Sequence, residues 1–254
     1  LVYGYVSWPN CIYKHTKKLS PGHIIRFDLR SKSIKTKAYW SVYDCYNQPR
    51  LSITLPEAIE ETERILSASF QYRMVADVPV GVFLSGGYDS TCVTALLQKE
   101  STARLKTFTI GSIDDQLDEA PFAKQVASRL GTDHTEYYCS AKEALDIIPD
   151  LPYYYDEPFA DSSAIPTILV SRMARKQVAV ALSADAGDEI FAWYNRYDYV
   201  SRYGEKIARI PGPFRKTLSY IMDRVSSEHI PYLRSSYNWH GRYHKLKKIL
   251  RDPS

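Results

Sequence analysis

The sequence predicts an α/β protein built on a doubly wound parallel sheet, preceded by a short N-terminal β segment. Apolar runs of strand length at 78–84, 105–111 and 177–182 alternate with longer segments of helical periodicity. Strands that alternate with helices in this way form βαβ units, which build parallel sheets. The run at 78–84 is almost wholly apolar, as expected for a strand that helices cover on both faces.

The beginning of the chain differs from the rest because it predicts β structure and turns. Segments 23–29 and 34–40 have strand composition, and the polar stretch 30–33 between them is typical of a turn. We therefore predict a hairpin, followed by a linker through residues 47–49, which read Asn-Gln-Pro.

A helical pattern begins at Leu55, where apolar residues recur at intervals of three and four. Pro56 and Glu57 suit the first turn of this helix, since proline needs no N–H partner there and a carboxylate favours the helix dipole. Gly131 is expected to end a later helix in the left-handed conformation. The region after Tyr194 predicts helix without clear boundaries. The other predicted elements are helices at 89–100, 119–130, 141–151 and 164–176 and a strand at 133–139.

Composition and charge argue against several classes of function. The chain has 254 residues, of which 44% are hydrophobic, so one or two domains can bury a core. The net charge of +4 suits a protein that handles polyphosphates but does not by itself predict nucleic-acid binding. The four cysteines are scattered without metal-site spacing, which favours reduced thiols in a cytoplasmic protein. No apolar run approaches the roughly 18 residues of a membrane span.

The segment SGGYDS, residues 85–90, follows the apolar strand at 78–84 and precedes a predicted helix. Ligands of parallel sheets bind beyond the carboxyl ends of the strands. Gly86 and Gly87 allow a tight turn and close approach of a ligand, and Ser85 and Ser90 add hydroxyl groups. The N–H groups of the turn and of the helix start then form a cradle for an anion. The sequence lacks the Walker pattern GxxxxGK[ST], so this is a different kind of phosphate loop.

Asp89 lies within this predicted cradle. A carboxylate beside a phosphate is repulsive unless a cation lies between them, and magnesium bound by carboxylates and phosphates meets that need. An alternative is that Asp89 only caps the helix and that the glycines only form a turn.

A second acidic turn follows the apolar strand at 177–182, in the stretch LSADAGDEIF. The carboxyl ends of the two strands are expected to face one crevice, so Asp89 and Asp188 could share one metal ion. Asp185 is then available as an acid–base group. The alternative is a solvated acidic loop with a helix cap.

Five stretches of the sequence form a combined pattern that is more specific than SGGxDS alone. They are residues 73–90, 106–111, 118–136, 153–167 and 180–197. Together they resemble the ATP-pyrophosphatase domain of the asparagine synthetase (glutamine-hydrolysing) family, and residues 3–23 resemble the end of that family's glutaminase domain. The resemblance implies the PP-loop, adenine nucleotide alpha hydrolase-like type of α/β fold, with ATP and Mg²⁺ as ligands.

The resemblance also implies roles for individual residues. Asp89 and Asp188 would hold magnesium, and Asp185 would assist the attack of ammonia on an aspartyl adenylate, which gives asparagine, AMP and pyrophosphate. The polar loop in 153–167 is expected to line the acceptor pocket, with a purely structural loop as the alternative. The ATP-binding residues would be Leu84, Ser85, Gly86, Gly87, Asp89, Ser90, Ile110, Ser183 and Ala184.

The same resemblance implies a domain organisation and partners. Residues 1–50 would be the end of the glutaminase domain with a linker, and 51–254 a synthetase domain truncated at its C-terminal end. The family's N-terminal cysteine nucleophile is missing, so we expect a fragment whose ammonia comes from a missing glutaminase domain. The expected partners are an aspartate-like carboxylate and, in the full-length cytoplasmic protein, a second copy as homodimer; neither nucleic acid nor membrane is expected.

Five residues depart from the family's pattern. Ala184 and Ala186 replace glycines, and alanine costs about 1 kcal/mol at a position that requires positive φ. Tyr88 replaces an aliphatic residue, and Ala192 and Trp193 stand where two glycines are usual. These departures place the acceptor specificity in question.

Three other functions compete with asparagine synthesis. One is amide formation on another carboxylate, as in β-lactam synthetases or lasso-peptide cyclases. Another is a degenerate partner module that keeps the fold without catalysis. A tRNA-modifying PP-loop enzyme is disfavoured by the mild charge and by the family-specific stretches.

Overall fold

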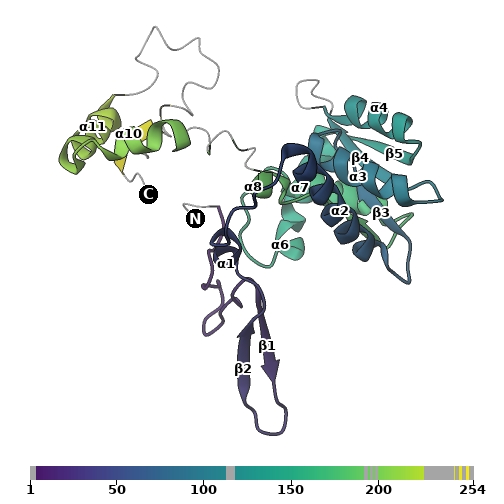
Figure 1. Cartoon of the computed structure of the whole chain (residues 1–254), viewed down its shortest axis with the longest axis horizontal. Helices are drawn as coiled ribbons and strands as arrows, with labels where there is room; N and C mark the ends of the chain where they lie inside the picture. Colours follow the sequence, from purple (N-terminus) through teal and green to yellow (C-terminus); the bar gives the residue numbers. More distant parts are fainter. Residues whose placement is uncertain are drawn as a thin grey trace. The chain divides into compact units, whose positions relative to one another are not determined.

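The computed structural model divides into two compact units, Leu1–Ala184 and Asp185–Ser254, which are described separately below (Figure 1). The predicted domain boundary after residue 50 stays a prediction. Among the described residues, no helix is both long and apolar enough to cross a membrane. The structure describes residues 4–112, 118–191, 194, 197, 200–225, 243, 246, 247, 250 and 251.

The first unit contains the predicted parallel sheet. Its four strands lie in the order β5-β4-β3-β6, and every neighbouring pair is parallel. Strand β3, which leads to the cradle, lies inside the sheet, and β6, which leads to the second acidic turn, lies next to it at the edge. The strands are β3 (Val80–Phe83), β4 (Lys106–Ser112), β5 (Asp133–Cys139) and β6 (Val180–Leu182).

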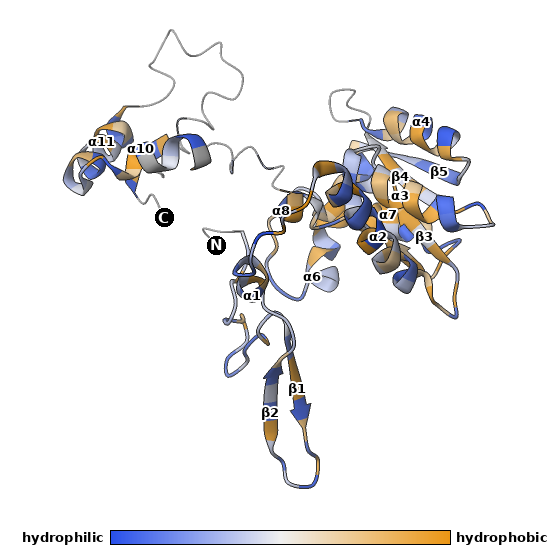
Figure 2. Ribbon diagram, in the orientation of Figure 1, coloured by the Kyte–Doolittle hydropathy of each residue, from blue (hydrophilic) through white to orange (hydrophobic). Residues whose placement is uncertain are grey.

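Helices cover both faces of the sheet, as the apolar run at 78–84 predicted. Val82 packs with residues of α3, Phe83 packs against a cluster that includes residues of α7, and Leu84 packs with residues of α4. Successive residues of a strand point to opposite faces, so α3 and α4 lie on one face and α7 on the other. Figure 2 shows α7 as mainly hydrophobic. These helices are α3 (Tyr88–Glu100), α4 (Ala120–Leu130) and α7 (Ala164–Ala174).

The helix boundaries follow local signals in the sequence. Helix α2 (Leu55–Met74) begins after Thr54, whose backbone N–H donates to the Glu57 carboxylate at 2.7 Å, and Pro56 lies in its first turn. Gly131 ends α4 with φ +72°, the left-handed conformation expected from the sequence.

The predicted helix at 141–151 consists of three shorter pieces. Pro149 and Pro152 each lie in the first turn of a new piece. Proline provides no N–H for an internal helical hydrogen bond, so each proline restarts the helix. The pieces are α5 (Ala141–Ile147), the 3₁₀ helix η1 (Ile148–Asp150) and α6 (Leu151–Tyr154).

The predicted hairpin is present near the N-terminus. Strands β1 (His23–Phe27) and β2 (Ile34–Ala38) are antiparallel, and the Asp28 carboxylate accepts the N–H groups of Arg30 and Ser31 in the turn. A short helix, α1 (Val42–Tyr46), precedes the predicted linker; the sequence analysis missed it.

The second unit is helical among its described residues. Its first helix begins directly after the acidic turn that follows β6. The elements are α8 (Gly187–Phe191), the π-helix η2 (Val200–Gly204), α10 (Glu205–Ala208) and α11 (Gly212–Arg224).

Candidate functional site

The turn between β3 and α3 contains the predicted anion cradle. Gly86 has φ +84°, and a Cβ atom added to it would lie 2.6 Å from the backbone nitrogen of Ala123 and 2.8 Å from the Cβ of Phe122. Both the conformation and the close contact require glycine. Gly86 therefore allows the turn to pack directly on the first turn of α4.

The two serines of the motif hold the turn closed. The Oγ of Ser90 accepts the backbone N–H of Ser85 at 3.1 Å, and the two serine Oγ atoms lie 2.9 Å apart. The backbone N–H of Gly87 donates to the Oγ of Ser85 at 3.2 Å. Ser90 is only 6% exposed, so its hydroxyl is a buried structural part of the turn.

The open side of the turn suits an anion. Gly87 is the N-cap of α3, is exposed, and has no side chain to cap the N–H groups of the first helical turn. These N–H groups and the helix dipole favour negative charge, such as that of a pyrophosphate. Asp89 lies half-buried in the same first turn, and its carboxylate is the type of ligand that Mg²⁺ uses beside phosphates. These residues fit a magnesium–nucleotide complex.

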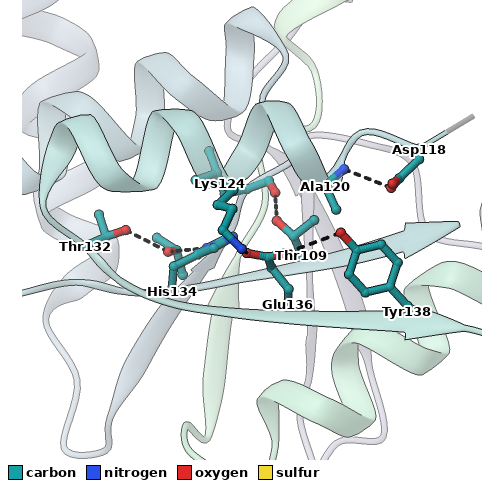
Figure 3. A network of polar contacts seen from close by, with 10 residues as sticks. Thr109, Asp118, Ala120, Lys124, Thr132, His134, Glu136 and Tyr138 are labelled. Atoms are coloured by element: carbon teal, nitrogen blue, oxygen red, sulfur yellow. Dashed lines mark hydrogen bonds and ion pairs between the residues drawn. The ribbon is translucent and has the colours of Figure 1, made fainter. Parts of the chain in front are cut away.

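The residues expected to flank the nucleoside lie on β4 and at the end of β3. Leu84 is 1% exposed, and its backbone N–H donates to the carbonyl of Phe108 at 2.9 Å. The hydroxyl of Thr109 donates to the carbonyl of Leu84, so β4 holds the strand that enters the cradle (Figure 3). Ile110 is half-buried and lies one residue further along β4. The sequence analysis missed Thr109, because strand pairing rather than a local motif places it here.

Polar contacts lie around the start of α4 and along β5 (Figure 3). Asp118 accepts the backbone N–H of Ala120 at 3.1 Å, and Lys124 forms an ion pair with Glu136 at 3.0 Å. His134 lies on β5 near Glu136, and burial lowers the pKa of His134. The neutral ring contacts the Thr107 hydroxyl through its Nδ1 at 2.9 Å. Of these contacts, the Lys124–Glu136 ion pair joins α4 to β5.

The second acidic turn spans the boundary between the two units. Ser183 and Ala184 end the first unit, and Ala184 packs against the core cluster that contains Val82. Asp185 and Asp188 belong to the second unit. The magnesium site shared by Asp89 and Asp188 therefore stays a prediction, as does the acid–base role of Asp185. No group of three or more His, Cys, Asp or Glu with metal-site geometry occurs among the described residues, and the proposed site needs only two carboxylates with phosphates.

A comparison with protein families identifies the family of the chain. The model of the asparagine synthase family matches residues 61–253, which include the cradle and the second acidic turn. The chain belongs to the asparagine synthase family.

Two curated relatives are longer than this chain. A putative asparagine synthetase [glutamine-hydrolyzing] 2 from Methanocaldococcus jannaschii is 37% identical over 86% of this chain and 43% of the relative. Asparagine synthetase [glutamine-hydrolyzing] 1 from Bacillus subtilis is 32% identical over 85% of this chain and 33% of the relative. The chain thus spans less than half the length of these relatives.

The chain is also similar to the solved structure of an NH3-dependent NAD synthetase from Campylobacter jejuni. It covers 74% of this chain and 93% of its own, with a TM-score of 0.36 and 9% identity. The fold class rests instead on the parallel sheet and the helices on its two faces.

The departures from the family pattern have different structural consequences. Ala186 has φ +77°, so the second acidic turn does require the left-handed conformation that glycine adopts more easily. Ala184 is not among the described residues with positive φ. Tyr88 is 84% exposed at the first position of α3. Ala192 and Trp193 lie outside the described residues.

Proposed function

We propose that this chain is the nucleotide-binding and amide-forming part of an asparagine synthetase-type ligase. The observation that carries the proposal is the turn of residues 84–90, where a glycine-permitted bend and a serine pair present the start of α3 to an anion. Membership of the asparagine synthase family supports the same activity.

The proposed reaction has two steps. A carboxylate oxygen of the acceptor attacks the α-phosphorus of ATP, forming an acyl adenylate while pyrophosphate leaves. Ammonia then attacks the acyl carbon, an amide bond forms, and AMP leaves. Adenylation is needed because a free carboxylate is a poor electrophile. Magnesium would neutralise charge on the departing pyrophosphate.

The residues of this chain have separate parts in the proposal. The cradle residues Ser85, Gly86, Gly87 and Ser90 orient the pyrophosphate group, and the segments at Leu84 and Ile110 flank the nucleoside. Ser183 and Ala184 would lie near the adenylate, Asp89 and Asp188 would hold magnesium, and Asp185 would accept a proton from the attacking ammonia. Ammonia is supplied by a glutaminase domain of the longer protein, and aspartate is the preferred acceptor.

A second function remains in competition, namely amide formation on a different carboxylate. Ala186 and Tyr88 favour this alternative, because each departs from the family's pattern at a position next to residues assigned to the chemistry. Ala186 has the left-handed conformation, and Tyr88 is exposed. A noncatalytic partner module predicts instead that magnesium–ATP does not bind.

The first experiment is a calorimetric titration of magnesium–ATP into the chain and into Asp89→Ala. Asp77→Ala is the matched control, because Asp77 is an exposed aspartate that precedes β3 rather than following it. We expect micromolar binding by the intact chain and the control and loss of most affinity in Asp89→Ala. Equal affinity of all three proteins would reject the magnesium role of Asp89.

A second experiment identifies the acceptor. The chain is incubated with magnesium–ATP, ammonia and one carboxylate at a time, and AMP and pyrophosphate are measured. AMP and asparagine formed only with aspartate would support asparagine synthesis. AMP formed only with another carboxylate would support the competing amide former, and ATP binding without AMP from any acceptor would reject both.

A further inference from the structure

The segment before the hairpin is fastened to the loop that precedes α7. The carboxylate of Glu157 forms an ion pair with Lys18 and accepts the backbone N–H of Ile12 at 3.2 Å. The side chain of Lys18 also donates to the carbonyl of Val6 at 2.6 Å. Glu157 therefore joins two points of the N-terminal segment, here residues 4–18, to one position of the loop, and Lys18 links this junction to Val6.

A backbone contact reinforces this junction. The N–H of Ala160 donates to the carbonyl of Gly4 at 2.8 Å. The side chain of Glu157 is 17% exposed and that of Lys18 is 37% exposed, so water screens this ion pair less than a fully exposed one. The pKa of Glu157 is lowered, first by its hydrogen bond with Lys18 and then by one with Cys11. The carboxylate is accordingly charged at neutral pH.

The start of the loop is attached to the core of the first unit. Tyr155 packs against the buried cluster that α5 and α7 form, and Ile110 of β4 packs against the same cluster. The rings of Tyr155 and Phe159 stack with centroids 5.0 Å apart, and the Tyr155 hydroxyl donates to the carbonyl of Ala164 at 3.4 Å. The start of the loop is thus held by the cluster of α5 and α7, while its middle contacts the N-terminal segment.

We propose that Glu157 is a positioning residue that uses the N-terminal segment to hold the loop of residues 156–163 in place for the acceptor carboxylate. The inference rests on the proposed amide-forming function. Between α6 and α7 the loop forms a short hydrogen-bonded turn at Asp161–Ala164 but no helix or strand, so contacts outside the loop help to order it. A displacement of the N-terminal segment should then displace this loop.

The first test measures hydrogen exchange of the loop in the whole chain. We expect Lys18→Ala and Glu157→Ala to speed exchange of residues 156–163 about tenfold, as loss of a part-buried ion pair and hydrogen bonds predicts. Lys18→Arg keeps the ion pair and should retain protection. Lys17→Ala is the control, because Lys17 is the exposed lysine next to Lys18. Unchanged exchange in both alanine variants overturns the proposal.

The second test separates a positioning role from a merely structural one. In Lys18→Ala, the KM for the acceptor should rise about tenfold while the Kd of magnesium–ATP stays unchanged, with recovery in Lys18→Arg. Faster exchange with an unchanged acceptor KM and kcat overturns the positioning role. If the intact chain forms no AMP at all, the proposed function fails, and the exchange measurement still decides whether Glu157 fastens the loop.

Discussion

The hydroxyl oxygens of Ser85 and Ser90 lie 2.9 Å apart across the turn that joins β3 to α3. Since the Ser90 hydroxyl also accepts the backbone N–H of Ser85, Ser90→Ala leaves a part-buried N–H without that partner. We expect the free energy of unfolding to fall by about 1–2 kcal/mol and the affinity for magnesium–ATP to fall with it. Urea unfolding and calorimetry check both effects. Ser52→Ala, at an exposed position, should change neither.

Gly86→Ala tests the contact between the cradle and α4. The new methyl group would lie 2.6 Å from the backbone nitrogen of Ala123 at a φ of +84°, so strain and overlap add together. We expect a loss of about 3 kcal/mol in urea unfolding. Gly131→Ala has a similar φ of +72° with open space around it, and should cost only about 1 kcal/mol. Equal costs would contradict the role given to the α4 contact.

Ala186→Gly tests the strain in the second acidic turn. Glycine adopts φ +77° without the penalty of a Cβ atom, so we expect a gain of up to about 1 kcal/mol in the free energy of unfolding. Ala184→Gly is the counterpart, since it removes a methyl group from the core cluster without relieving a positive φ. That change should instead cost about 1 kcal/mol. The same sign for both variants would refute this interpretation.

Glu143 predicts a pH dependence of stability. Hydrogen bonds from the Tyr137 hydroxyl and then from Ser140 lower the pKa of Glu143 from its ordinary 4.5 to about 2. Folding lowers the pKa of this carboxyl group, so the ionised carboxylate stabilises the folded state above pH 4.5. This stabilisation is lost as the pH falls through 4.5 towards 2. Glu143→Gln should therefore lower the Tm at pH 7 and flatten its decline with acid. The exposed Glu60→Gln should follow the parent curve, and an unaltered Glu143→Gln curve would refute the assignment.

The sheet and the cradle could be predicted from the sequence because their signals are local. The apolar run at 78–84 and the glycines after it are consecutive residues, so composition and turn chemistry identify them without knowledge of the fold. The strand at 133–139 was predicted with the bounds that the structure has. Helix α1 escaped prediction because five residues are too few for a helical period to be distinguished.

Contacts between distant segments could not be predicted in this way. Thr109 reaches the cradle because β4 pairs with β3. Glu157 forms an ion pair with Lys18, although most of the sequence of the first unit separates the two residues. Nothing near Glu157 in the sequence distinguishes it from a solvated loop carboxylate. The left-handed conformation of Ala186 could likewise be suspected only because the family usually has glycine at this position. Alanine itself gives no signal of positive φ.

The packing of β3 has a consequence for how the protein opens. Val82, Phe83 and Leu84 belong to three different buried clusters, on both faces of the sheet. A local opening that separates one helix from the sheet leaves the other two clusters intact around this strand. Exposure of the strand therefore requires nearly the whole free energy of global unfolding. The segment that enters the anion cradle should remain native, and resistant to proteases, while the edges of the domain fluctuate.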